Sequence, residues 1–237
     1  MGRIHNIEGK KNKMDSLRSS AFTKHARNIT VAARSGGGDP AYNAALKLAI
    51  DKAKADNMPN DNINRAIKKG IGATDGDKYE HITYEGYGPG GVALIIECLT
   101  DNKNRTAGNV RHYLDKFGGN LGTAGCVSFM FERKGAIAID KEDCPLDEDA
   151  LMELALESGA EDFSAEDSHY EIIAAPEDYV AVREALEENK IPLISGDITM
   201  LPSNYTEVPE ENAKGMQKLL DALEDDDDIQ NVYSNMQ

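Results

Sequence analysis

The sequence predicts an α+β, multidomain protein, with a helical N-terminal domain followed by two α+β domains of the ferredoxin-like kind, the last inserted into the middle one. In residues 1–80 the apolar side chains recur at helical spacing, whereas the rest of the 237-residue chain alternates predicted strands with predicted helices. Residues 135–202 read as βαββαβ, the order of the ferredoxin-like unit, and they interrupt a second α+β pattern.

Three helices are predicted in the N-terminal domain. The first, over 20–34, has an apolar stripe formed by Phe22, Ala26, Ile29 and Ala33. Asp39 and Pro40 suit the N-cap and first position of a second helix, which should bury Tyr42. A third helix should start near Met58 and stop at Gly70, before a linker rich in turn-forming residues.

The middle domain is predicted from two separated segments, 81–134 and 203–237. The first should contain strands at 82–85, 92–99 and 127–132 and a helix at 101–117. The second offers only a helix at 210–223 and a strand at 229–233, which bury too little surface to fold alone. We therefore expect them to complete the first segment. Between them, 135–202 should supply strands at 135–140, 161–165, 169–174 and 193–201 and helices at 147–158 and 176–189.

Charge is distributed very unevenly along the chain. The formal net charge is −16, which alone argues against a phosphate-binding protein. Residues 1–80, however, carry 15 Lys or Arg against 9 Asp or Glu, whereas residues 135–237 carry 5 against 28. The acidity therefore excludes phosphate contact only for the last third. No apolar run reaches the roughly 20 residues of a membrane span, and the odd number of cysteines favours a cytoplasmic location.

Catalytic and cofactor signals are weak throughout. The loop Gly86–Gly91 fits the letters of a dinucleotide fingerprint but leads into a predicted strand, so we expect a structural turn and regard an enzyme using this loop as the weaker hypothesis. The cysteines and histidines lack the spacings of metal sites, and the acidic runs 142–149 and 224–228 are expected to be solvated. We predict no catalytic residue, metal or cofactor, and nothing indicates a small-molecule substrate.

Basic residues in and near the helical domain are the candidate nucleic-acid ligands, because Lys and Arg side chains neutralise phosphates. A solvated polar face is the alternative explanation for them. A second candidate is one side of the predicted helix 101–117. The full set is Lys10, Lys11, Lys13, Arg18, Lys24, Arg27, Arg34, Arg65, Lys68, Lys69, Arg105 and Lys116. With no Trp and five Phe, base stacking is not indicated.

Several segments in order resemble the YebC/PmpR family of bacterial proteins, which has mitochondrial translational-activator relatives. The matching stretches are Ile29–Arg34 with Gly36–Pro40, Asn57–Ile63, Arg65–Gly70, Tyr84–Val92, Thr100–Thr106 and Gly118–Gly122. The resemblance implies three domains, one helical and two α+β. Family members commonly begin with a Gly-His-Ser-Lys-Trp segment, whereas this chain reads Gly2-Arg3-Ile4-His5-Asn6 and resembles a shorter-start branch.

The resemblance also implies a function. The family is described chiefly as cytoplasmic DNA-binding transcriptional regulators, which makes a non-enzymatic regulator with DNA as partner the leading hypothesis. Other members resemble translation factors that act on ribosomes, including those stalled at proline-rich stretches, so a ribosome or rRNA partner is the alternative. The sequence shows no clear helix-turn-helix spacing, which favours recognition of RNA shape over base reading.

Overall fold

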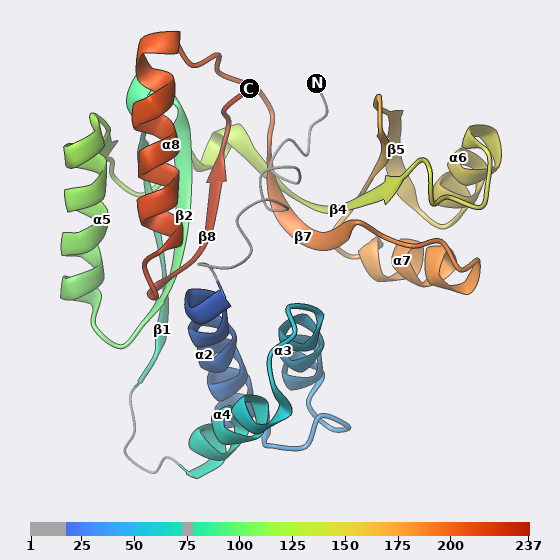
Figure 1. The fold of residues 1–237 in the computed structure, drawn as a ribbon, viewed down its shortest axis with the longest axis horizontal. Helices are drawn as coiled ribbons and strands as arrows, with labels where there is room; N and C mark the ends of the chain where they lie inside the picture. The colour runs from blue at the N-terminus through green and yellow to red at the C-terminus, as the bar shows by residue number, and fades with distance from the viewer. Residues whose placement is uncertain (1–17, 73–77) are drawn as a thin grey trace. The chain divides into compact units, whose positions relative to one another are not determined.

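The computed structural model describes residues 18–72 and 78–237, with side chains from residue 20 onward (Figure 1). Its described residues form two compact units. The larger unit comprises 18–127 and 207–234, and the inserted unit comprises 128–206 with 235–237. The α+β architecture with a helical N-terminal part is as predicted; the three domain boundaries stay a prediction.

The helical part of the larger unit consists of α2 (Arg18–Gly36), α3 (Ala44–Ala55) and α4 (Asn60–Gly72). Ile29 and Ala33 of the predicted stripe are buried, and Phe22 and Ala26 pack against the same core, because a spacing of three or four residues returns to one side of a helix. Leu46, Ile50 and Ile63 complete this core from α3 and α4.

The predicted start of α3 is wrong. Asp39 forms a turn, in which its Oδ1 accepts a hydrogen bond from Ala41 N at 2.9 Å, and the helix begins at Ala44 after the N-cap Asn43. Asn43 is the N-cap in place of Asp39 because its side chain also donates hydrogen bonds to two carbonyl oxygens of the preceding segment. Tyr42 therefore lies outside the helix and is 89% exposed, contrary to the prediction that it is buried.

The rest of the larger unit is a four-stranded antiparallel sheet in the order β3-β1-β2-β8, with α5 (Lys103–Phe117) and α8 (Glu210–Glu224) packed against it (Figure 1). The strands are β1 (Glu80–Tyr87), β2 (Ala93–Thr100), β3 (Asn120–Leu121) and β8 (Ile229–Ser234). The late strand β8 thus belongs to the same sheet as the strands of the early segment. Between β1 and β2, Pro89–Gly91 forms a short 3-10 turn, so no α-helix N-terminus follows the glycine-rich loop.

The inserted unit has the predicted ferredoxin-like order. Its sheet is β5-β6-β4-β7, and all three pairs of neighbouring strands are antiparallel. The elements are β4 (Phe131–Asp140), α6 (Glu148–Glu157), β5 (Ala160–Ala165), β6 (His169–Ala174), α7 (Tyr179–Glu188) and β7 (Ser195–Pro202). Its apolar core draws on both helices and on strands β4 and β6.

One strand prediction fails at the junction of the two units. Residues 127–132 do not form a strand of the middle domain: Ser128–Met130 is a 3-10 turn, and β4 begins at Phe131. The predicted strands 127–132 and 135–140 would leave a break at 133–134. This break is absent because β4 pairs continuously with β7 from Phe131 to Ala138. The short strand β3 pairs with β1 at one edge of the sheet of the larger unit. No helix among the described residues has the length and apolarity to cross a membrane.

Candidate nucleic-acid interface

The predicted cations fall into groups with different surroundings. Lys10, Lys11 and Lys13 lie outside the described residues, and Arg18 belongs to α2 without a described side chain. The others belong to the larger unit. They are Lys24, Arg27 and Arg34 on α2, Arg65, Lys68 and Lys69 on α4, and Arg105 and Lys116 on α5.

The three cations of α4 share one exposed side of that helix. Arg65, Lys68 and Lys69 are exposed, whereas Ile63, Ala66 and Gly70 are buried against the helical core. Positions i, i+3 and i+4 fall within about 100° around a helix axis. We call Arg65, Lys68 and Lys69 the α4 basic face; all three residues are exposed.

An aromatic ring lies between this face and α2. The ring centroid of Tyr79 is 5.7 Å from Lys69 Nζ and 5.6 Å from the guanidinium carbon of Arg27. Both distances are within the roughly 6 Å over which a cation is attracted to a ring face. Tyr79, the residue before β1, thus contacts a cation from each of the two helices.

Two predicted cations of α2 bind the protein itself. Lys24 Nζ donates to the carbonyl oxygen of Glu224 at 2.5 Å, and its burial lowers the pKa of this lysine despite the acidic residues nearby. Arg27 donates to the carbonyl oxygens of Leu99 at 3.1 Å and Asp227 at 2.8 Å. Arg34, at the end of the same helix, is partly buried. These contacts fix the position of α2 on the sheet of the larger unit.

Arg27 also contacts a buried carboxylate, that of Asp228, and for this residue the expectation that 224–228 is solvated is wrong, although Asp225 and Asp227 are exposed. Asp228 is 3% exposed. Its Oδ1 accepts from Arg27 Nη1 at 2.6 Å, and its Oδ2 accepts from Arg105 Nη2 and Thr106 Oγ1, both at 2.8 Å. Thr100 Oγ1 donates to the same oxygen at 3.2 Å. Burial alone would raise the pKa of Asp228, but the hydrogen bonds from Arg105, Arg27 and Thr106 outweigh it and lower the pKa.

Arg105 is exposed, but its guanidinium is hydrogen-bonded to two carboxylates. Besides Asp228, its Nη2 donates to Asp101 Oδ1 at 2.7 Å, and the hydrogen bonds from these two carboxylates raise its pKa. Asn109, one turn further along α5, donates to Asp226 at 3.0 Å. Lys116, at the far end of α5, is exposed, with its Nζ 5.2 Å from the ring of Phe117. Of the predicted cations on α5, Lys116 therefore has the more open surroundings.

The surface around Asp228 does not suit a phosphate. A hollow of about 410 Å³ is lined by the carboxylates of Asp101 and Asp225–Asp228 together with Arg27, Arg105 and Asn109. Five acidic residues against two arginines give this hollow a negative excess, which repels an anion. The described residues contain no group of His, Cys, Asp or Glu arranged to hold a metal ion. The hollow thus belongs to the structural contact between α2 and α5.

The basic residues of α3 were not predicted as ligands from the sequence. Lys47, Lys52 and Lys54 are exposed on a helix with one acidic residue, Asp51. Dense runs of cations such as 65–69 stand out in the sequence, whereas these lysines are spread over two turns. Counting charge by predicted helix would have found them, since the described segment 18–72 carries ten basic and four acidic residues.

Comparisons with known proteins agree on one family. Residues 2–73 match the family model described as "TACO1/YebC protein N-terminal domain", and residues 79–236 match "TACO1/YebC second and third domain". A "Probable transcriptional regulatory protein" of Clostridioides difficile is 61% identical over 236 residues, with 99% of this chain and 98% of the relative covered. One of Geobacillus kaustophilus is 54% identical over 231 residues, with 98% and 94% covered.

A solved structure is also similar. The crystal structure of a conserved hypothetical protein from Aquifex aeolicus matches with a TM-score of 0.82 and 45% identity, and the match covers 95% of this chain and 92% of that one. The two family models together span most of the chain, and the relatives are similar over nearly their whole length. The chain belongs to the TACO1/YebC family, whose members similar to it are named probable transcriptional regulatory proteins.

Proposed function

We propose that the protein is a non-enzymatic transcriptional regulator of the cytoplasm that binds DNA through the phosphate backbone, with the α4 basic face as its main contact. The observation that carries this proposal is the exposure of Arg65, Lys68 and Lys69 on one side of α4, while Lys24, Arg27 and Arg105 bind acceptors within the protein. Exposed Lys and Arg side chains release condensed counterions when they meet phosphates, which drives binding.

The names of the relatives support a nucleic-acid partner. The distribution of charge supports the helical part, which carries the α4 basic face, as the region that contacts this partner. Residues 128–206 carry 20 acidic and 5 basic residues, so the inserted unit repels phosphate and leaves the helical part to make the contact. Lys116 and the α3 lysines are further candidates. Since phosphates are common to DNA and RNA, the ribosome is the alternative target of the same face.

The test compares two full-length variants of equal charge change. The α4 variant carries Arg65→Gln, Lys68→Gln and Lys69→Gln. The control variant carries Lys190→Gln, Lys214→Gln and Lys218→Gln, which are exposed residues elsewhere. Affinity for a DNA duplex and for ribosomal particles is measured at one salt concentration. We expect the α4 variant to bind its target at least about tenfold more weakly than the control variant. Equal affinity of both variants would overturn the assignment of this face.

The same measurement separates the two targets. A promoter-binding regulator should hold duplex DNA more tightly than ribosomal particles at equal salt. If the protein instead binds ribosomal particles more tightly than duplex DNA, and the α4 variant is still impaired, the basic face remains the contact surface and the ribosome replaces DNA as the partner. Circular dichroism of both variants should match the wild type, because all six substituted side chains are exposed.

A further inference from the structure

Tyr42 has an aromatic side chain that is exposed to solvent. At 89% exposure it is the most exposed of the large apolar side chains in the described part of the chain, above Phe129 at 76%. Single exposed apolar residues are common and need no explanation by themselves. The surroundings of Tyr42, however, combine a rigid support with a hollow lined by cations.

The backbone on either side of Tyr42 is held in place by hydrogen bonds. Tyr42 N donates to Asp39 O at 3.1 Å, and Ala41 N donates to Asp39 Oδ1 at 2.9 Å. Asn43 is buried, and its Nδ2 donates to Ala32 O and Gly37 O, both at 2.8 Å. The ring therefore points outward from a backbone that is already ordered. Because the backbone is ordered before binding, less conformational entropy is lost when a ligand binds.

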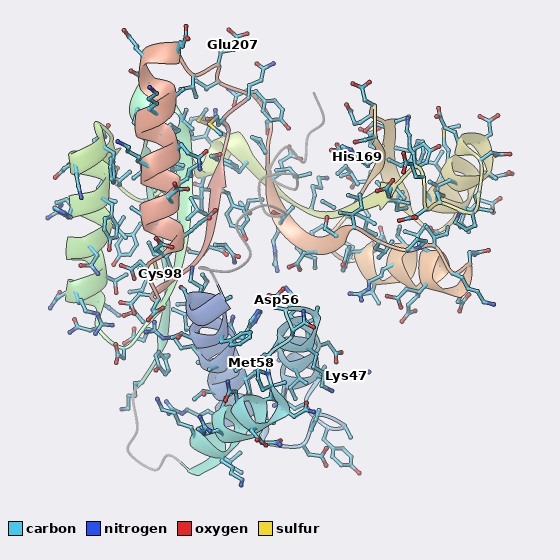
Figure 2. All side chains as sticks on the ribbon, viewed as in Figure 1. Lys47, Asp56, Met58, Cys98, His169 and Glu207 are labelled. Atoms are coloured by element: carbon cyan, nitrogen blue, oxygen red, sulfur yellow. The ribbon has the colours of Figure 1, made fainter. Side chains whose placement is uncertain are left out.

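A hollow of about 350 Å³ starts beside this turn. It is lined by Pro40, Ala41, Lys47, Ile50, Asp51 and Lys54. Lys47 and Lys54 stand seven residues apart on α3, which places them on one side of the helix. Figure 2 shows Lys47 extending from α3 away from α2 and α4. The hollow thus offers apolar carbon, two ammonium groups and one carboxylate that can accept from a base amino group.

We propose that Tyr42 and this hollow form a site for an unpaired nucleotide, with the base stacked on the Tyr42 ring and the flanking phosphates contacted by Lys47 and Lys54. Every base has a π-face, so stacking on an aromatic side chain is largely independent of sequence. Bases within a duplex are already stacked on their neighbours, so the site selects single-stranded segments. This site rests on the proposed nucleic-acid function and extends it by naming the form of the ligand.

The lysines favour a nucleic acid over a protein as the ligand of this site. The described helical part carries ten basic and four acidic residues, and both cations of the hollow are exposed. The turn that carries the Tyr42 ring borders the hollow through Pro40 and Ala41, and a ring on this turn together with the two ammonium groups of the hollow complements a base attached to a phosphate. Single-stranded DNA and single-stranded RNA share this chemistry, and separate titrations with each tell which one the site prefers.

The absence of Trp from the chain gives a direct probe. Full-length Tyr42→Trp has one tryptophan, whose fluorescence falls when a base stacks on it. We expect saturable quenching by an oligothymidylate or an oligouridylate, and none by an abasic oligonucleotide of equal length or by a duplex. Phe129→Trp, at another exposed aromatic position, is the matched control and should not be quenched.

Affinity measurements give a second readout. Tyr42→Ala should bind single-stranded oligonucleotides about tenfold more weakly and leave duplex binding unchanged, whereas Tyr42→Phe should bind like the wild type because it keeps the ring. Binding that depends on the α4 basic face, without quenching and with normal affinity of Tyr42→Ala, would overturn the stacking site alone. Absence of any nucleic-acid binding by the wild type would overturn the proposed function itself.

Discussion

Arg27 Nη1 lies 2.6 Å from Asp228 Oδ1, and this contact joins α2 to the residue just before β8, 201 positions later in the chain. Only 16% of the Arg27 side chain and 4% of the Asp228 side chain are exposed. Arg105 approaches the same carboxylate from α5. One buried carboxylate thus connects the helical part, α5 and the C-terminal strand of the larger unit.

Removing the charge of Asp228 should destabilise the larger unit. In Asp228→Asn the amide cannot neutralise Arg27 and Arg105, and unpairing a buried ion pair costs about 3 kcal/mol. Asp225→Asn is the matched control, because Asp225 is exposed and its substitution should change the free energy of unfolding by no more than about 0.5 kcal/mol. Urea denaturation of both variants measures this, and equal midpoints would contradict the structural role of Asp228.

The same carboxylate should make stability depend on pH in a defined direction. The pKa of Asp228 in the folded protein lies below its ordinary value of 3.8, so its contribution is present above that value and is lost as the pH falls toward the folded pKa. The difference in unfolding free energy between wild type and Asp228→Asn should therefore stay constant from neutral pH to about pH 5 and shrink on further acidification. A difference that grows below pH 5 would show that the folded pKa is raised.

The sequence alone could not reveal this cluster. Regular elements were predictable because apolar spacing determines which face a helix or strand buries, as with Ile29 and Ala33 of α2. Asp228, in contrast, follows three other aspartates and resembles a solvated run, while its partner Thr106 is 122 residues away. Long-range pairing of polar groups has no periodic signature, so the sequence alone does not show that Lys24, Arg27 and Arg105 bind acceptors within the protein.

The same reason explains the error at Tyr42. Asp39 and Pro40 satisfy the local rules for a helix start, but Asn43 also reaches Ala32 O and Gly37 O across the turn, and these tertiary contacts move the start to Ala44. The exposed cations of α4 were predictable, since helix periodicity places Arg65, Lys68 and Lys69 opposite the buried Ile63 and Ala66.

Gly70 should be required for the close packing of α4 on α2. A Cβ at this position would lie 2.6 Å from Thr30 O and 2.7 Å from Ala33 Cβ, and neither neighbour is the end of a flexible side chain. Gly70→Ala should therefore destabilise the protein by about 2 kcal/mol through overpacking. Gly72→Ala meets nothing within 4 Å and should leave stability unchanged or slightly raised. Thermal unfolding of the two variants checks this, and similar losses in both would refute the packing argument.

Cys98 should be unreactive while the protein is folded. It is buried in β2, and burial is the main reason that its pKa is raised to about 12, so almost no thiolate exists near neutral pH (Figure 2). A maleimide applied at about pH 7.5 should label Cys144, which is partly buried, well before Cys98, and unfolding in urea should abolish the difference. Mass spectrometry of the labelled peptides gives the order. Labelling of native Cys98 as fast as Cys144 would contradict its burial.

The salt dependence of DNA binding tests the role of the α4 basic face most directly. The slope of log affinity against log salt concentration counts the phosphates that a protein neutralises, at roughly 0.9 per phosphate on duplex DNA. For the variant with Arg65→Gln, Lys68→Gln and Lys69→Gln, we predict a slope shallower than that of the wild type by about 1 for each phosphate that is no longer neutralised. The control variant with Lys190→Gln, Lys214→Gln and Lys218→Gln should keep the wild-type slope. Identical slopes for all three proteins would contradict phosphate binding by α4.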